Sequence, residues 1–133
     1  MYLLNVPGSS LDTSWGAVPA SIIRRRAQLP PPVPGQPGPF SLGGAGVLAG
    51  CFREAGFANA EVRTVPVPLG AASAAEYVHV AREAFGAFNA MMAHLPAEER
   101  ESVWSEVEGS MRSFESSGGF EVPGECLVGA ATK

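Results

Sequence analysis

The segment Ala60–Val67, "AEVRTVPV", is the stretch from which the fold of this 133-residue chain is predicted. Three valines within it are β-branched and favour a strand. Pro66 and Pro68 have no amide hydrogen to donate, so we expect this strand to lie at the edge of a sheet, at least in its second half. The tail Phe120–Thr132 is a second strand candidate, interrupted at Pro123-Gly124 and strongest over Cys126–Ala131.

Helices are predicted before and between these strands. Apolar residues at helical spacing indicate one helix over about Val18–Gln28 and another over about Ala45–Ala55, which Gly56 would end in left-handed geometry. A third helix begins at the capping box Ser73-Ala74-Ala75-Glu76, where the serine can accept an amide hydrogen and the glutamate can reach back to the cap. Its apolar stripe continues to Leu95. A fourth helix begins around Pro96.

We expect a single, partial domain. In chain order it has an N-terminal segment with a helix (1–28), a proline-rich connector (29–39), a helix and a strand (40–72), a helix pair (73–117) and a C-terminal strand (118–133). The connector holds six of the twelve prolines and should be extended and stiff. Two strands rarely form an independent sheet, so the set of elements indicates an incomplete fold.

The composition excludes several classes of protein. A formal charge of −4 argues against nonspecific binding of nucleic acid, which requires Lys and Arg to neutralise phosphates. No apolar run approaches the roughly 20 residues of a membrane helix, and no signal peptide is recognisable, so we expect a cytoplasmic protein. Cys51 and Cys126 belong to no metal or disulfide motif, and we expect two reduced, mostly buried thiols.

The stretch Gly44–Gly50, "GAGVLAG", has a glycine spacing that can cradle a phosphate or a nucleoside cofactor. Such a loop requires a strand that leads into it and an acidic residue after the following strand. No strand is predicted before Gly43, and the segment Val67–Ala72, in which the following strand ends, has no acid. We therefore expect the glycines to loosen a turn and to let a short helix pack closely, without binding a cofactor.

No residue is assigned a catalytic or metal-binding role from its chemistry. His79 and His94 have no cysteine or carboxylate at ligand spacing. The acids that follow Pro96 are explained by the helix dipole. The aromatic stripe that contains Tyr77 and Phe88 is more typical of a core than of a pocket. Together with Met91-Met92, however, it could also line an apolar cleft.

Five segments, taken in order, resemble the C-terminal part of class I S-adenosylmethionine-dependent methyltransferases, of the large branch that acts on small molecules. They are "SWGAVPASIIRRRAQLPPPVPGQPGPFSL" (14–42), "LAGCFREAGF" (48–57), "EVRTVPVPLGAASAAEYVHVAREAF" (61–85), "LPAEERESVW" (95–104) and "GGFEVPGECLVGAA" (118–131). None of these segments is a catalytic signature, and the resemblance lies in their order and spacing.

The resemblance implies part of a Rossmann-like, seven-stranded α/β sheet whose last two strands pair antiparallel. Ala60–Val67 would be the sixth strand and Cys126–Ala131 the seventh, with the helix pair Ser73–Phe114 inserted between them. The helix near Val18 and the proline-rich connector would follow the fifth strand and help to cover the acceptor pocket. On this view the chain has about four helices and two of the seven strands.

The resemblance also implies S-adenosylmethionine as the cofactor of the family. The family holds it with an acidic-Gly-x-Gly-x-Gly loop after the first strand and an acidic residue after the second. This sequence has neither, so we expect the chain alone to bind no cofactor and to be inactive. Whether it functions as an enzyme therefore stays open.

Four aromatic residues are candidates for the lining of the acceptor pocket. They are Trp15, Phe40, Tyr77 and Phe88. The expected partners are an N-terminal methyltransferase half, or a second copy bound through strand edges, and a small-molecule methyl acceptor. Two other functions stay open, a non-enzymatic dimerisation or interaction module and a binder of small apolar ligands.

Overall fold

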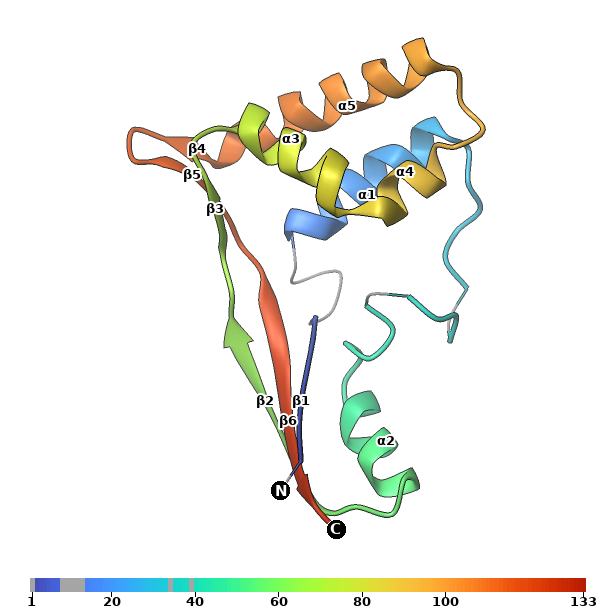
Figure 1. The fold of residues 1–133 in the computed structure, drawn as a ribbon, viewed down its shortest axis with the longest axis vertical. Coiled ribbons are helices and arrows are strands. Elements are labelled where there is room, and N and C mark those ends of the chain that lie inside the picture. Colours follow the sequence, from blue (N-terminus) through green and yellow to red (C-terminus); the bar gives the residue numbers. More distant parts are fainter. Residues whose placement is uncertain (1, 8–13, 34, 39) are drawn as a thin grey trace. The chain divides into compact units, whose positions relative to one another are not determined.

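The computed structural model describes residues 2–7, 14–33, 35–38 and 40–133. They belong to two compact units, each assembled from separate stretches of the chain (Figure 1). The first, named the sheet unit, is drawn from Met1–Ser14, Val33–Pro68 and Pro123–Lys133. The second, named the helical unit, is drawn from Trp15–Pro32 and Leu69–Val122. The chain is thus mixed α/β.

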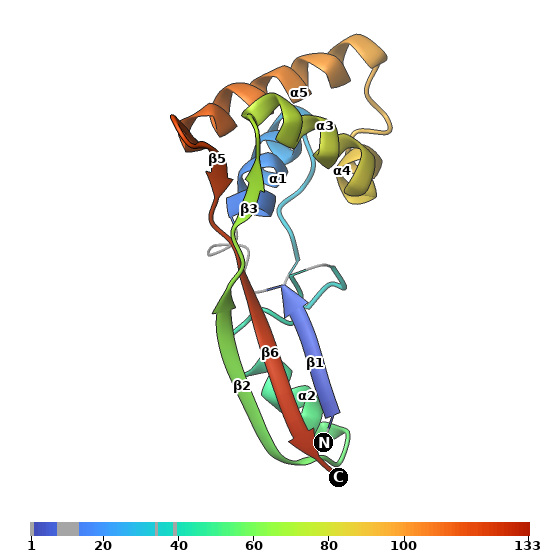
Figure 2. The same ribbon diagram turned by 60° about the vertical axis from the view of Figure 1, so that its left-hand side comes forward.

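The sheet unit contains a three-stranded antiparallel sheet. Its strands are β1 (Tyr2–Pro7), β2 (Ala58–Pro66) and β6 (Glu125–Thr132). The order is β1-β6-β2, and β6 runs antiparallel to both neighbours (Figure 2). The predicted strands are therefore present and pair with each other. Strand β1 was not predicted, because its partner lies more than a hundred residues away and no local pattern indicates the pairing.

Strand β2 lies at a sheet edge, as its prolines predict. Its register shifts between Ala58 and Glu61, where Asn59 adopts a φ of +51°. At its other end the Val67 amide donates to the Gly124 carbonyl over 2.8 Å, and Pro68 follows with no amide hydrogen. Both ends of this strand are therefore irregular.

Helix α2 (Val47–Glu54) covers one face of this sheet through Leu48 and Phe52, which pack with Ala131. A Cβ atom at Gly129 would lie 2.6 Å from Phe52 Cε2, so only a glycine lets the helix lie this close. The helix ends as predicted. Gly56 has a φ of +80°, and its amide and the next one donate to the Arg53 and Phe52 carbonyls over 3.0 and 2.9 Å.

The helical unit is built from four α-helices, a short 3₁₀ turn and a small sheet. The helices are α1 (Ser14–Arg26), α3 (Ala74–Ala84), α4 (Gly86–Met91) and α5 (Ala97–Met111), with the turn at Arg112–Phe114. The strands are β3 (Leu69–Ala71), β4 (Glu115–Ser116) and β5 (Gly119–Val122), in the order β3-β5-β4. Strand β5 lies in the predicted C-terminal strand segment, before its interruption at Pro123-Gly124, whereas β3 and β4 were not predicted.

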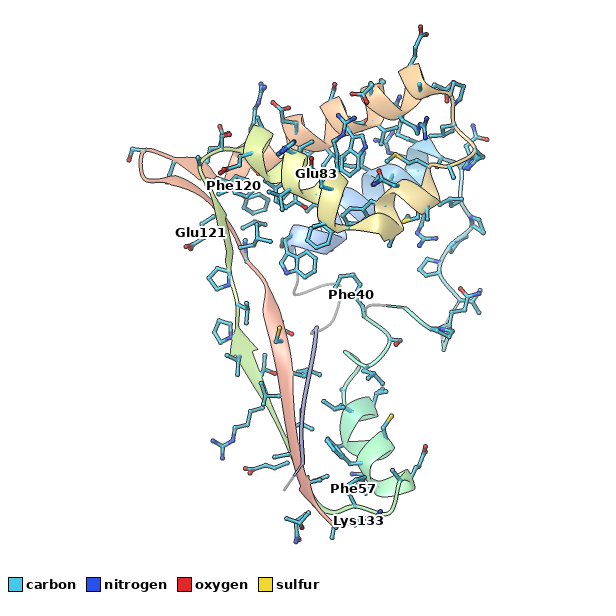
Figure 3. All side chains as sticks on the ribbon, viewed as in Figure 1. Phe40, Phe57, Glu83, Phe120, Glu121 and Lys133 are labelled. Atoms are coloured by element: carbon cyan, nitrogen blue, oxygen red, sulfur yellow. The ribbon has the colours of Figure 1, made fainter. Side chains whose placement is uncertain are left out.

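The core of the helical unit lies between its helices and the small sheet. Its large, fully buried side chains include Tyr77, Ile23, Met92, Val103, Val107, Met111 and Val122. Strand β5 alternates, since Phe120 is buried towards the helices and Glu121 points to solvent (Figure 3). The apolar stripe from Ser73 to Leu95 does not form the one continuous helix that was predicted. It is broken at Phe85, whose φ and ψ of −100° and 73° are not helical.

Candidate functional site

Two of the four predicted pocket residues lie in one aromatic cluster of the helical unit. The Trp15 ring stacks on Phe85 with centroids 5.2 Å apart, and Phe85 meets Phe88 edge-on at 5.7 Å. Phe88 in turn meets Trp104 edge-on at 6.2 Å. Helix α1 therefore joins the helix pair through aromatic side chains, which contribute both apolar area and preferred ring geometry.

Tyr77, the third predicted residue, is tied to the same cluster through the backbone. Its hydroxyl donates a hydrogen bond to the Trp15 carbonyl. In a regular helix that carbonyl would accept from residue 19, but Pro19 lies within α1 and has no amide hydrogen. The Tyr77 ring stacks on Phe120 at 5.4 Å, and burial raises the pKa of its hydroxyl.

Phe40, the fourth predicted residue, belongs to the sheet unit. It lies half-buried in a turn, where the Gly43 amide donates to its carbonyl over 3.0 Å. Trp15, Tyr77 and Phe88 belong to the helical unit, and the last two are buried in its core. Their burial agrees with the core interpretation of the aromatic stripe, while the role of all four in a substrate pocket stays a prediction.

The three arginines at the end of α1 are used within the helical unit. Arg25 and Arg26 both form ion pairs with Glu106 of α5, and Arg26 also donates to the Ser102 hydroxyl over 3.0 Å. These hydrogen bonds, that from Arg26 above all, lower the pKa of the Glu106 carboxyl. Arg25 and Arg26 thus take part in a structural contact between α1 and α5, while Arg24 donates to the Pro30 carbonyl over 2.6 Å.

A charged hollow of about 400 Å³ lies on the surface of the helical unit. Its lining is Ala75, Val78, His79, Arg82, Glu83 and Glu108. The His79 imidazole lies 3.6 Å from the Glu83 carboxylate, and both side chains are exposed. Arg82 pairs with Glu101 and lies 5.9 Å from the Trp104 ring centroid. These contacts are typical of a solvated helix surface rather than of a built site.

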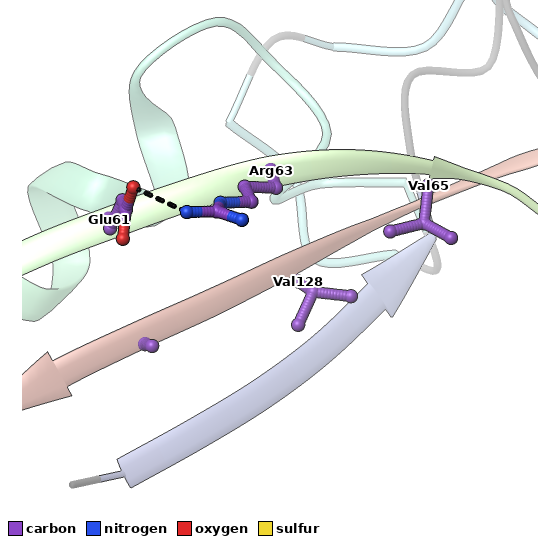
Figure 4. Close-up of a pocket in the computed structure, with 5 residues that line it drawn as sticks. Glu61, Arg63, Val65 and Val128 are labelled. Carbon is purple, nitrogen blue, oxygen red and sulfur yellow. Dashed lines mark hydrogen bonds and ion pairs between the residues drawn. The ribbon is translucent and has the colours of Figure 1, made fainter.

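A second hollow, of about 270 Å³, lies on a face of the sheet in the sheet unit (Figure 4). Val65 and Val128 form its apolar part together with Ala130, and the Glu61–Arg63 ion pair spans 3.0 Å at its border. The register places Glu61 opposite Ala130 and Arg63 opposite Val128, so these residues share one face of the sheet. These residues were not predicted as a set, although the alternation along β2 could have indicated them.

The glycine stretch and the cysteines belong to the same unit. The residues at 40–46 form turns and bends that lead into α2, and no strand is found among them. Gly46 precedes the helix at a φ of +75°.

Both thiols are free, as expected. The prediction that they are mostly buried is wrong for Cys51, which is exposed on α2, while Cys126 is half-buried. A short amphipathic helix has an outer face, and Cys51 lies on it.

Among the described residues, no group of three or more His, Cys, Asp or Glu side chains could hold a metal ion. In the same part of the chain, no helix has the length and apolar character to cross a membrane. Neither a family model nor a curated protein matches this chain.

Proposed function

We propose that this chain is the C-terminal, acceptor-side portion of a small-molecule methyltransferase of the S-adenosylmethionine-dependent class. The observation that carries the proposal is the antiparallel pairing of β2 with β6. The resemblance assigns these two segments to the last two strands of the family sheet, which pair in this way. A sheet unit of this kind would form the closing edge of a larger Rossmann-like sheet.

The place of β1 supports the same proposal. It comes directly before α1 in the chain, where the resemblance expects the fifth strand, and it pairs with β6. Strands β1 and β2 both run antiparallel to β6, so they run parallel to each other, and α2 packs on the sheet between them in sequence. A helical crossover between parallel strands is typical of α/β proteins. The chain then supplies three strands of the family sheet rather than two.

The helical unit would contribute the acceptor side. It contains the segment between β2 and β6, which the resemblance treats as an insertion, together with α1. Trp15 and Phe85 of its aromatic cluster are only partly buried and would give a small acceptor an apolar wall. A fixed wall orients the nucleophile, which is the main contribution a protein makes to a transfer reaction of this kind.

The residues described here do not fit the S-adenosylmethionine site of the family. Gly44–Gly50 follows turns rather than a strand. The segment between β2 and α3 has no carboxylate. The first carboxylate after it is Glu76 in α3, which accepts a hydrogen bond from the Ala72 amide. We therefore assign no step of methyl transfer to this chain, and expect the donor site on another part of the polypeptide or on a partner.

The proposal is tested by reading the genomic DNA immediately upstream of Met1. We expect a reading frame with the acidic-Gly-x-Gly-x-Gly loop, and methyl transfer from labelled S-adenosylmethionine to a small acceptor when its product is expressed together with this chain. A co-expressed pair that forms a complex but transfers no label, or an upstream region without such a frame, contradicts the proposal.

The alternative of an apolar-ligand carrier is less well supported. It requires the Met and Phe side chains of the helix pair to line an open cleft. Met92 is fully buried and Phe88 nearly so, and both pack in the core of the helical unit. In this conformation they are not available to a ligand.

A further inference from the structure

The two edges of the sheet in the sheet unit differ in their chemistry. Strand β1 forms one edge and β2 the other. The β1 sequence Tyr-Leu-Leu-Asn-Val-Pro is uncharged, and its only proline is the last residue. Its register with β6 is regular from Tyr2 to Pro7. In the part of the chain that the structure describes, β1 pairs with β6 alone.

Strand β2 carries the features that keep a sheet edge from pairing. Its register is shifted near Asn59, which has a positive φ, and Pro66 and Pro68 interrupt the other end. The exposed, charged pair Glu61 and Arg63 lies between. The β2 edge is therefore protected along its length, while β1 has no charged residue and no register shift, and its one proline is its last residue.

We propose that two copies of this chain associate by antiparallel pairing of β1 with β1 of the second copy. An uncharged strand can pair with itself because no like charges come to stand opposite each other. A two-fold axis between the copies would leave β2 at both outer edges of the resulting six-stranded sheet, and these edges are protected. The association therefore stops at a dimer and does not grow into a fibre.

The register of this pairing follows from the alternation of a strand. Residues that stand opposite each other in an antiparallel pair have their side chains on the same face of the sheet. The two-fold axis must therefore lie midway between the two copies of one residue, so that this residue stands opposite its own copy. An axis at Leu4 pairs Tyr2 with Val6 and Leu3 with Asn5 of the second copy, and leaves Pro7, which has no amide hydrogen, outside the ladder. Leu4 then stands opposite its own copy. This inference does not rest on the proposed function and concerns the chain without the missing strands, which would have to pair at the same edge of β1 because the β2 edge is protected.

The test uses the whole chain and two measurements. The first is light scattering after size exclusion over a hundredfold range of concentration. The second is disulfide cross-linking of L4C, with R63C on β2 as the matched control, both in a background with Cys51→Ser and Cys126→Ala. Residues opposite each other in an antiparallel pair have Cα atoms about 4.5–5.5 Å apart, which a disulfide can bridge.

We expect a mass of two chains, dissociating on dilution, and a cross-linked dimer with L4C in several-fold excess over that with R63C. Three results overturn the proposal. They are a monomer at every concentration, an open-ended series of larger species, and cross-linking of R63C equal to or greater than that of L4C.

Discussion

Gly129 decides how closely α2 can lie on the sheet. A Cβ atom there would lie 2.6 Å from Phe52 Cε2 and 3.1 Å from Leu48 Cδ2, and both side chains are in the core of the sheet unit. Because these side chains have little room to move, we expect Gly129→Ala to destabilise the sheet unit by about 1–3 kcal/mol. Amide hydrogen exchange of α2 and β6 measures the loss.

The matched control is Gly50→Ala, within α2. A Cβ atom at Gly50 would meet only the far end of Arg53, at 3.9 Å. Alanine is the better helix former, so we expect this variant to gain about 0.5–1 kcal/mol. Equal protection in the two variants would show that the close approach of the helix is not what requires Gly129.

Tyr77 and Pro19 act together in the helical unit. Tyr77→Phe removes the hydroxyl that donates to the Trp15 carbonyl. We expect the free energy of unfolding to fall by about 1–3 kcal/mol, because this carbonyl then loses its hydrogen-bond donor. Pro19→Ala restores an amide at the position where a regular helix would supply one. A double-mutant cycle by denaturant unfolding should therefore show a smaller cost of Tyr77→Phe in the Pro19→Ala background. Additive costs would refute the coupling.

The same hydroxyl predicts a dependence of stability on pH. Burial raises the pKa of Tyr77 in the folded chain, while in the unfolded chain it keeps the ordinary value of about 10. Below pH 10 both states hold the proton and the contribution to stability is complete. As the pH rises above 10 the unfolded state loses its proton first, so stability falls. The difference in unfolding free energy between the wild type and Tyr77→Phe should shrink over this range; a constant difference would contradict the burial of the hydroxyl.

At the scale of elements, three side chains accept hydrogen bonds from backbone amides at the N-terminus of α3. The Ser73 hydroxyl accepts from the Glu76 amide over 3.1 Å, and Glu115 of β4 accepts from the Ala74 amide over 2.7 Å. The Glu76 carboxylate accepts from Ala72, one residue before the cap that it was predicted to reach. The capping box is otherwise as predicted.

This arrangement makes Ser73→Ala costly. We expect a loss of about 1 kcal/mol, because the Glu76 amide loses its acceptor, and a near-complete recovery in Ser73→Asp, which supplies a carboxylate oxygen in the same place. Thermal unfolding followed by circular dichroism measures both variants. The same melting temperature in Ser73→Ala and the wild type would mean that the cap contributes nothing to the helix.

Elements whose signals are local could be predicted from the sequence. The end of α2 is an example, since Gly56 and Phe57 specify a left-handed turn followed by a residue that packs back; the Phe57 ring meets Phe52 edge-on at 5.8 Å. The edge position of β2 follows from Pro66 and Pro68. The break of the helix pair at Phe85 could not be predicted, because the apolar spacing continues across it and only Gly86 marks it.

At the scale of the whole molecule, the features that were not predicted depend on distant contacts. Strand β1 exists through β6, and β3 and β5 exist through each other, with about fifty residues between them. The sheet-face residues that include Val65 and Val128 come together only through the register of β2 and β6. The buried residues form two separate sets, one in each unit.

The central claim is that this chain provides closing strands and an acceptor side but no donor site. It is tested most directly by calorimetric titration of S-adenosylmethionine into the chain alone and into its complex with the co-expressed product of the upstream reading frame, with adenosine as the control ligand. We expect no heat of binding for the chain alone and one bound S-adenosylmethionine per complex. Stoichiometric binding by the chain alone, or a complex that binds none, would contradict it.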